Sequence, residues 1–395
     1  MNSQTTIAGI PEEFRDIAPY GDAEFKEKMR QLVNEPGFEH AIKYVNPNID
    51  YKAFAATLLN VDSQHVFQSV IMRKFLEELE ATTTDGISAD GLENVEEGKS
   101  YTFITNHRDI VLDASFLNLC FIRANMPITQ VAIGNNLLIY EWISDLVKLN
   151  RSFIVKRDVK MKAALDAAKQ LSAYIHYTIN TLKESVWIAQ REGRAKDSND
   201  LTQDSLIKML SLAGGGTVKE NVLSANLCPV SISYEYDPND YLKAREFLLK
   251  RRDPLFRKSK RDDLFSMETG MLKRKGKIMF RIGRCINPQL ASLDSDNRIE
   301  VIRRTCQIID KSIHCGYEIY PCNYISHDEI NHSRQFASQY TDEDVKRFDS
   351  YISAQLAKVD VPDITKEEYE FMRHMMLMMY ANPLRNKMSA TCTDL

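Results

Sequence analysis

The sequence lacks the features of a disulfide-bonded, zinc-binding or membrane-spanning protein. Its seven cysteines are scattered over 395 residues without a C-x-x-C pair, which predicts reduced thiols, as in a cytosol, and no zinc site. No stretch approaches the roughly 18 consecutive apolar residues of a spanning helix. Residues 114–122 form one of the longest apolar stretches and still include Ser and Asn. The N-terminus has no basic region followed by an apolar run, so we expect no signal peptide.

Signals for nucleic-acid or nucleotide binding are also missing. The net charge of −4 argues against general nucleic-acid binding. The triplet Gly214–Gly216 lacks the G-K-[ST] ending of a phosphate-binding loop and is interpreted as a turn. With 44% hydrophobic and 27% charged residues, the composition is that of an ordinary globular protein. The length allows one large α/β domain plus a smaller one.

The chain is organised around the stretch Tyr101–Asp113. Tyr101 to Thr105 alternates bulky and β-branched residues and predicts a buried strand, and apolar residues recur at helical spacing from Asp109 to Arg123. His107 therefore lies where a strand gives way to a helix. The positive end of the helix dipole disfavours imidazolium and keeps the ring neutral, as a general base requires. A capping or buried polar histidine is the alternative, and this stretch alone leaves both open.

A second strand end carries two adjacent cations. The short apolar strand Phe153–Val155 leads into Lys156 and Arg157, which could hold a phosphate or form a solvated pair. A long helix is expected to follow over Asp158–Lys183.

The third strand end combines a glycine with charges of both signs. The strand Val186–Ala189 delivers Glu192, Gly193 and Arg194. Glycine lets the backbone come close to a ligand, Glu192 could accept a bond from a hydroxyl, and the fork of donors on Arg194 could grip a phosphate. A local ion-pair cluster is the alternative.

Alternation of strands and helices from Tyr101 to Tyr236 predicts an α/β fold with a mainly parallel sheet flanked by helices. Ligands of such sheets collect beyond the carboxyl ends of the strands. His107, Arg157 and the segment Glu192–Arg194 all follow strand ends, so we expect them to converge on one crevice.

Four stretches in this order carry a resemblance to a known family. They are Asn106-His107-Arg108 with a following acid, Asn150–Arg157, Val186–Arg194 and Cys228–Tyr236. Their order resembles the glycerolipid acyltransferases, which comprise glycerol-3-phosphate acyltransferases and their lysophosphatidate relatives. The blocks of that family read N-H-x4-D, F-I-x-R, E-G-x-R and V-P-V-x-x-x-Y. The resemblance covers residues 100–290 and, through the Tyr-Glu after the fourth strand, looks closer to the bacterial glycerol-3-phosphate acyltransferases.

The chain departs from this pattern at two points. Asp113 lies one residue further from His107 than the family spacing, whereas Asp109 is much too close, and Glu192-Gly193-Arg194 is one residue shorter than E-G-x-R. The resemblance implies a general base at His107 and, at Asp113, the acid that orients its ring. Which of Asp109 and Asp113 pairs with the histidine stays open. The residues that the resemblance and the strand ends suggest for the acceptor's polar head are Lys156, Arg157, Glu192, Gly193 and Arg194.

The resemblance implies an O-acyltransferase. Its donor would be acyl-CoA or acyl carrier protein, its acceptor a hydroxyl of glycerol 3-phosphate or a related lysolipid, and neither a metal nor a bound cofactor is implied. Lysophosphatidate or an acylated amino acid could replace glycerol 3-phosphate as acceptor. A His–Asp pair could instead activate water in a thioesterase. The unusual spacings could also mark a lipid- or acyl-carrier-binding protein without catalysis.

Charge and helical periodicity suggest three regions. Residues 1–98 are predicted as an acidic helical region, with helices over 23–34, 51–61 and 65–83 and a linker over 84–99. These helices form a small domain of their own or, alternatively, are additional helices of one single domain. Residues 99–290 form the α/β domain, and 291–395 form a helical C-terminal extension packed on it. That extension contains a methionine-rich helix over 367–380, which is interpreted as core or, alternatively, as a contact for acyl chains.

A basic stretch suggests where the protein could dock. Residues 243–284 hold fifteen Lys and Arg against five Asp and Glu. This excess is an ordinary solvated face or a patch for anionic lipid, for the phosphates of coenzyme A or for an acidic carrier protein. We therefore expect a cytoplasmic protein associated peripherally with the inner face of the membrane.

Overall fold

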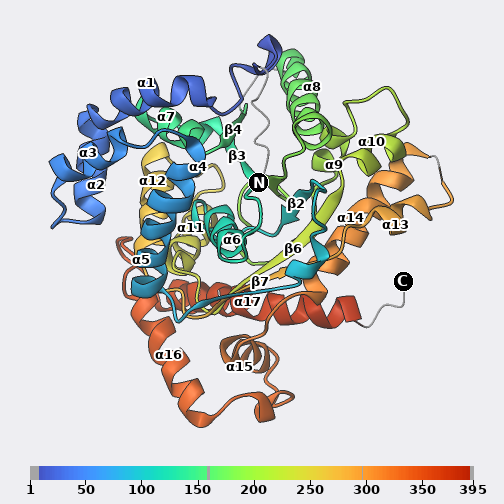
Figure 1. Cartoon of the computed structure of the whole chain (residues 1–395). Helices are drawn as coiled ribbons and strands as arrows, with labels where there is room; N and C mark the ends of the chain where they lie inside the picture. Colours follow the sequence, from blue (N-terminus) through green and yellow to red (C-terminus); the bar gives the residue numbers. More distant parts are fainter. Residues whose placement is uncertain (1–8, 158–160, 296, 392–395) are drawn as a thin grey trace.

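A seven-stranded sheet forms the centre of the computed structural model, which describes residues 9–157, 161–295 and 297–391 (Figure 1). The strands, in sheet order, are β1 (Ile87–Asp90), β7 (Ile278–Ile282), β6 (Leu227–Tyr234), β2 (Thr102–Thr105), β5 (Val186–Ala189), β3 (Gln130–Gly134) and β4 (Ser152–Val155). The strands from β6 to β4 run parallel, β7 is antiparallel to β6, and β1 is parallel to β7. The predicted mainly parallel sheet flanked by helices is confirmed.

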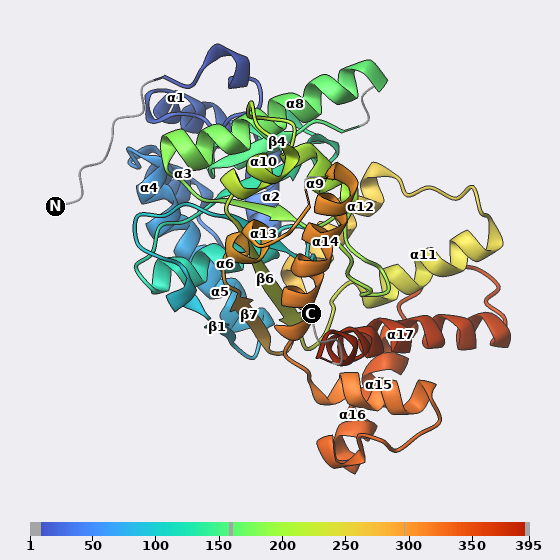
Figure 2. The same ribbon diagram turned by 90° about the vertical axis from the view of Figure 1, so that its right-hand side faces the viewer.

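Two layers of helices cover the sheet (Figure 2). All residues of β2 and β6 are buried, including the two threonines of β2 and the two serines of β6 among their apolar neighbours. On one face, α5 (Arg73–Thr83) and α6 (Leu112–Arg123) pack against side chains such as Phe103 and Phe280. On the other face, a second core contains Ile104 and Ile188. The helices of that core are α8 (Met161–Tyr177), α9 (Asp204–Leu210), α10 (Val218–Ser224), α13 (Asn287–Ala291) and α14 (Arg298–Cys315). The first three residues of the helix predicted from Asp158 lie outside the described residues.

The N-terminal helices form their own core against α7 (Glu141–Leu149). They are α1 (Asp22–Val33), α2 (Pro36–Val45), α3 (Tyr51–Leu59) and α4 (Gln64–Val66), followed by a π-helical turn (Phe67–Met72) that runs into α5. Phe25, Leu32 and Phe67 are buried there together with Leu149 of α7. The helices predicted over 23–34, 51–61 and 65–83 are present, and α2, which begins with Pro36, is an additional one.

The linker predicted over residues 84–99 is wrong, because this segment contains β1. Ile87 to Asp90 pair in parallel with Ile278 to Arg281 of β7. Ser88 and Asp90 of this four-residue edge strand are exposed, and Ile87 and Ala89 are only half-buried, so its sequence lacks the apolar signal of the central strands. The N-terminal region is therefore joined to the sheet by backbone hydrogen bonds.

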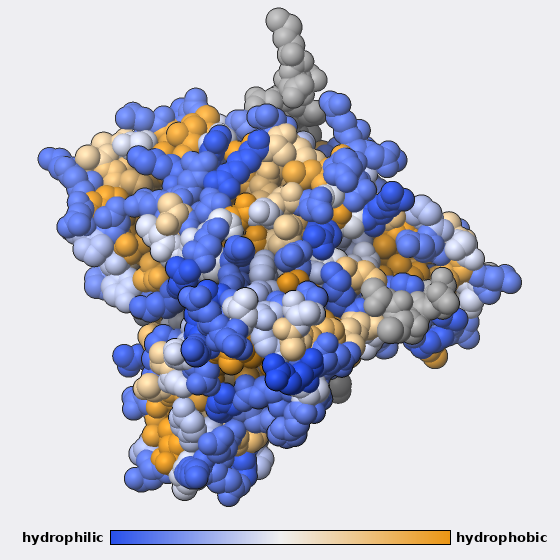
Figure 3. All heavy atoms as spheres, turned by 90° about the horizontal axis from the view of Figure 1, so that it is seen from below, coloured by the Kyte–Doolittle hydropathy of each residue, from blue (hydrophilic) through white to orange (hydrophobic). Residues whose placement is uncertain are grey.

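The C-terminal helices share a core with α11 (Asp240–Arg252), the helix that follows β6. They are α15 (Pro321–Ile330), α16 (Asp342–Leu356) and α17 (Lys366–Thr391). Met372, Met376 and Met379 of α17 are buried in their shared core, as the core interpretation of the methionine-rich helix predicts. The face seen from below is mostly hydrophilic, with small separate apolar patches (Figure 3). Among the described residues, every helix is too short or too polar to cross a membrane.

Candidate functional site

The loop after β2 is fixed by a buried asparagine. The side chain of Asn106 donates to the backbone oxygen of Ile232 at 2.9 Å and accepts from its N–H at 2.8 Å. These two bonds attach the loop to β6, because the amide group of Asn106 bonds the backbone of Ile232 as a neighbouring strand would. His107 and the residues after it therefore start from a rigid position at the carboxyl end of β2.

The helix after this loop begins at Leu112 rather than at Asp109, which corrects the predicted start. Asp109 accepts the backbone N–H groups of Val111 at 2.9 Å and Leu112 at 2.8 Å through Oδ1. A carboxylate in this position satisfies donors that the first helical turn leaves free. The loop from Arg108 to Val111 thus absorbs the extra residue between His107 and Asp113, and His107 lies before the helix.

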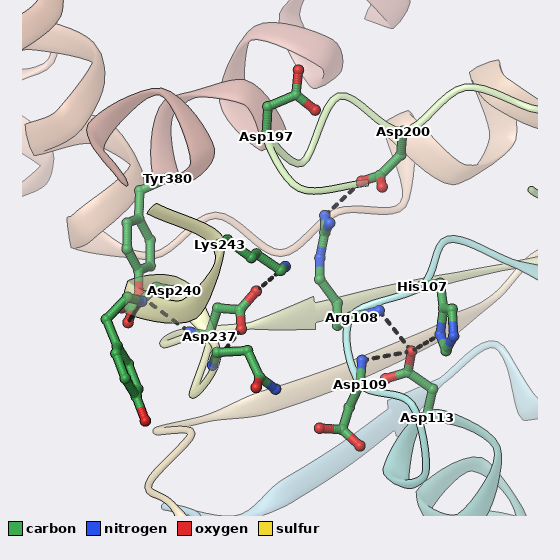
Figure 4. Close-up of polar contacts among 12 residues, drawn as sticks. His107, Arg108, Asp109, Asp113, Asp197, Asp200, Asp237, Asp240, Lys243 and Tyr380 are labelled. Atoms are coloured by element: carbon green, nitrogen blue, oxygen red, sulfur yellow. Dashed lines mark hydrogen bonds and ion pairs between the residues drawn. The ribbon is translucent and has the colours of Figure 1, made fainter. Parts of the chain in front are cut away.

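His107 contacts Asp113 directly, as Figure 4 shows. Nδ1 of His107 lies 2.8 Å from Oδ2 of Asp113, and the same oxygen accepts the backbone N–H groups of Arg108 at 2.6 Å and Asp109 at 3.0 Å. A carboxylate facing Nδ1 favours the tautomer with the proton on that nitrogen, which leaves Nε2 as the basic atom. The His107 side chain is 12% exposed, whereas that of Asp113 is buried. Asp113, and not Asp109, makes the contact.

His107 lines a large cavity. The cavity has a volume of about 2710 Å³ and runs among α2, α3, α5, α7 and α12 (Lys260–Leu272). Its apolar lining includes Phe38, Phe54, Ile71, Leu146 and Met271. The ring of His107 also meets Trp187 of β5 edge to face, with 5.7 Å between the centroids. A basic imidazole nitrogen thus borders an apolar space large enough for a long hydrocarbon chain.

The residues predicted from the other strand ends reach the same cavity. Arg157, Glu192, Gly193 and Arg194 all line it. Arg157 and Glu192 form a loose ion pair, with 3.7 Å between Nε and Oε1, and the Glu192 side chain is 68% exposed. Gly193 has a φ of 69°, a conformation that favours glycine.

Lys156 also lines the cavity, but its ammonium group is engaged elsewhere. It lies 2.5 Å from Oδ2 of Asp16 and donates to Gln170 of α8 at 2.9 Å. A role in holding a substrate would require breaking these contacts, so among the predicted residues Lys156 has the weakest support.

A buried ion pair ties the loop of His107 to the loop that follows Arg194. Nη2 of Arg108 lies 2.7 Å from Oδ2 of Asp200, which also accepts the hydroxyl of Tyr317 from the end of α14 at 2.6 Å. Burial alone would lower the pKa of Arg108, but the charge of Asp200 raises it above its usual value. No sequence signal predicts this pair, because the two residues lie far apart in the chain and match no motif.

A second carboxyl group lies beside Asp113. Oδ2 of Asp109 is buried and has no hydrogen-bond partner among the described residues. Burial, followed by the charge of Asp113, raises the pKa of Asp109 above its usual value. The same two carboxyl groups add to burial in raising the pKa of Tyr234 on β6. The part of the chain that the structure describes contains no group of His, Cys, Asp and Glu arranged to hold a metal ion.

Comparisons with known proteins find similarity among solved structures alone. No family model and no curated protein matches the chain. Among solved structures, it is similar to the crystal structure of the 1-acyl-sn-glycerophosphate (LPA) acyltransferase PlsC from Thermotoga maritima. The two share 11% identity with a TM-score of 0.35, and the match covers 73% of this chain and 95% of that one. So loose an overlap carries no weight for the function of this chain, which has to be inferred from its own residues and their geometry.

Proposed function

We propose that this protein is an acyltransferase. It moves a fatty acyl group from acyl-CoA or acyl carrier protein to a hydroxyl of glycerol 3-phosphate or a related lysolipid. One observation carries the proposal: His107, whose Nδ1 lies 2.8 Å from Oδ2 of the buried Asp113, lines a cavity of about 2710 Å³ with a mainly apolar lining. The order of the four motifs supports the same chemistry.

In the proposed reaction, His107 is the general base. Nε2 takes the proton of the acceptor hydroxyl while the hydroxyl oxygen attacks the carbonyl carbon of the thioester. The carbon–sulfur bond then breaks, and the thiolate leaves and takes the proton from the imidazolium. Asp113 stabilises the imidazolium and holds Nδ1 protonated. The acceptor is itself the nucleophile, so the chain needs no acylated side chain.

The cavity suggests how the two substrates divide the site. Its apolar lining suits the hydrocarbon chain of the donor, because burial of a methylene group contributes about 0.8 kcal/mol. The charged residues Arg157, Glu192 and Arg194 suit the polar head of the acceptor. In this arrangement the thioester carbonyl lies between the apolar lining and the charged residues, next to His107.

The proposal includes docking on the inner face of an anionic membrane. The segment between α11 and α12 extends away from the sheet in Figure 2 and includes Arg257 and Lys258. Leu255 in this segment is 80% exposed, and Leu264 and Phe265 of α12 are exposed where they line the cavity. Exposed apolar groups among cations are the combination that binds an anionic bilayer surface.

The direct test is an acyl-transfer assay with the purified protein. Acyl-CoA and acyl carrier protein serve as donors, and glycerol 3-phosphate, lysophosphatidate, an acylated amino acid and water serve as acceptors. We expect transfer to a phosphate-bearing hydroxyl acceptor, lowered about 10²–10⁴-fold in His107→Ala. Release of free fatty acid without transfer would identify a thioesterase. Binding of acyl chains without any turnover would identify a binding protein.

A further inference from the structure

Asn239 is a buried polar residue whose side chain has no partner in the described part of the chain. It precedes α11 as the helix N-cap, where an asparagine side chain usually accepts a backbone N–H of the first turn. Here its side chain makes no cap hydrogen bond. Asn239 is 0% exposed, and neither Oδ1 nor Nδ2 has a hydrogen-bond partner among the described residues. It nevertheless lines the cavity of His107. An amide left unpaired in such a place costs about 1–3 kcal/mol unless a ligand or water satisfies it.

Lys243 adds a buried cation one helical turn after Asn239. Residues four apart lie on the same side of a helix, and Lys243 also lines the cavity. Its ammonium group is paired with the buried carboxylate of Asp237, which accounts for one of its three N–H donors. Figure 4 shows the Lys243 side chain extending from α11 toward the region of Arg108. The two remaining donors have no hydrogen-bond partner among the described residues.

Gly270 of α12 places Asn239 next to the loop of His107. A Cβ atom added at Gly270 would lie 1.9 Å from Oδ2 of Asp109 and 3.3 Å from Nδ2 of Asn239. The side chains of Asp109 and Asn239 therefore both lie against Gly270. Asp109 follows His107 by two residues, so the amide of Asn239 is held close to the catalytic loop.

Arg194, from the loop after β5, adds a guanidinium to the same cavity lining. Arg194 thus lines the same cavity as Asn239 and Lys243, and its charge opposes the rise in the pKa of Asp109 and helps to lower the pKa of Asp237. Nη1 of Arg194 is buried and has no hydrogen-bond partner among the described residues. Asp237 balances the charge of Lys243, whereas Asp109, on which the charge of Arg194 also acts, has a pKa that is raised by burial and by the charge of Asp113.

We propose that Asn239 and Lys243, together with Arg194, form a subsite that binds the phosphate monoester of the acceptor and determines acceptor specificity. Donors converge there from a guanidinium, an ammonium and an amide, which suits the several oxygens of a phosphate better than the two of a carboxylate. The inference rests on the proposed acyl transfer and extends it to the segment between β6 and α11, outside the residues predicted from the sequence. It also accounts for the unpaired amide of Asn239.

Asn239 offers a clean test, because its replacement removes no side-chain hydrogen bond among the described residues. Binding of glycerol 3-phosphate, inorganic phosphate and glycerol to the full-length protein is measured by calorimetry without a donor. The KM for glycerol 3-phosphate and for lysophosphatidate is measured with acyl-CoA. The variants are Asn239→Ala and Asn239→Asp, and thermal melting reports whether each is folded. The matched control is Asn297→Asp, an exposed N-cap of α14 outside the cavity lining that an aspartate also caps.

We expect glycerol 3-phosphate and phosphate to bind and glycerol not to bind. Asn239→Ala should raise the dissociation constant and the KM about 10-fold, the loss of one hydrogen bond to a charged group. Asn239→Asp should raise both about 100-fold, because its carboxylate competes for Arg194 and Lys243. In both variants kcat at saturating acceptor should change far less than KM, and Asn297→Asp should leave both constants unchanged. A KM raised for both acceptors indicates a site for the shared phosphate, whereas a KM raised for glycerol 3-phosphate alone assigns it to the small acceptor.

Other results separate this inference from the proposed function. Normal KM and normal binding in both folded Asn239 variants would overturn the subsite and leave acyl transfer intact. Asn239-dependent binding of phosphate in a protein that transfers no acyl group would refute the proposed function and keep the subsite. Failure of wild-type protein to bind either glycerol 3-phosphate or phosphate at millimolar concentration would rule the subsite out, whatever the activity.

Discussion

Oδ2 of Asp113 accepts from His107 and from two backbone amides with a single oxygen atom. The acid therefore orients the imidazole and fixes the loop that carries it. The two backbone N–H groups can only donate, so any side chain at position 113 has to present an acceptor to them.

This arrangement predicts different costs for two substitutions at Asp113. Asp113→Asn keeps its amide oxygen toward the two N–H groups, so Nδ1 of His107 still finds an acceptor and the tautomer is preserved. Only the charge that stabilises the imidazolium is lost, and we expect kcat to fall about 10²-fold. Asp113→Ala removes both the charge and the acceptor that fixes the tautomer, so its kcat should fall about 10⁴-fold. Nitrogen-15 NMR of the histidine ring reports the tautomer, and a proton on Nε2 in Asp113→Asn would contradict this account.

Asp109 predicts a pH dependence of stability. Its folded pKa is raised above 3.8 by burial and by Asp113, so the folded protein holds the proton more tightly than the unfolded chain does. As the pH rises above 3.8, the unfolded state loses its proton first, and wild type loses stability until the pH passes the raised folded pKa. Asp109→Asn keeps an oxygen for the helix cap and does not titrate. The free energy of unfolding of Asp109→Asn, compared with that of wild type in denaturant titrations, should therefore increase as the pH rises from 3.8 to the raised pKa of Asp109. Its activity should change little. A constant difference from about pH 4 to about pH 8 would speak against a raised pKa.

The ion pair between Arg108 and Asp200 predicts a structural role. Arg108→Met leaves a buried carboxylate without its partner and should reduce the free energy of unfolding by about 3–5 kcal/mol. The double variant with Asp200→Asn removes the stranded charge and should recover part of that loss. Arg303→Met, which breaks the exposed pair with Glu300, should cost no more than about 1 kcal/mol. Equal losses in the buried and exposed variants, measured by denaturant unfolding, would exclude the proposed tie between the two loops.

Docking on a membrane is predicted to depend on Leu255. Leu255→Asp should weaken binding to anionic vesicles, and binding of wild type should fall as salt is raised. The matched control is Ile299→Asp on α14, since Ile299 is 77% exposed and lies outside the cavity lining. Sedimentation with vesicles of anionic or neutral lipid gives the measurement. Equal binding of wild type to both kinds of vesicle, or equal losses in the two variants, would remove the segment between α11 and α12 from the docking surface.

The sequence predicts the parallel part of the fold because its central strands are rich in apolar and β-branched residues. Strands β2, β5 and β6 are buried on both faces, so burial and composition agree. Strand β1 escapes prediction because a short edge strand needs no apolar side chains. The predicted start of α6 lies three residues early, because Ile110 and Val111 continue the apolar pattern through a loop that only the Asp109 cap defines.

The candidate site could be predicted only where a residue follows a strand directly. His107, Arg157 and Arg194 all reach the cavity for this reason. Lys156 satisfies the same rule, but side-chain direction depends on neighbours such as Asp16, which the local sequence does not reveal. Asn239 carries no functional signal in the sequence, because an asparagine before a helix is an ordinary cap. Its unpaired side chain becomes visible only in three dimensions.

The pairing of β1 with β7 constrains how the chain is made. β1 leaves the ribosome early, but its partner Ile278–Ile282 is synthesised about 190 residues later, roughly ten seconds or more at the usual rate of translation. Until then the polar edge segment has no strand to join, although the N-terminal helices can already pack against α7. Folding of this edge of the sheet must therefore wait until most of the protein has been translated, and a nascent chain that stops before residue 278 retains an unpaired amino-terminal strand.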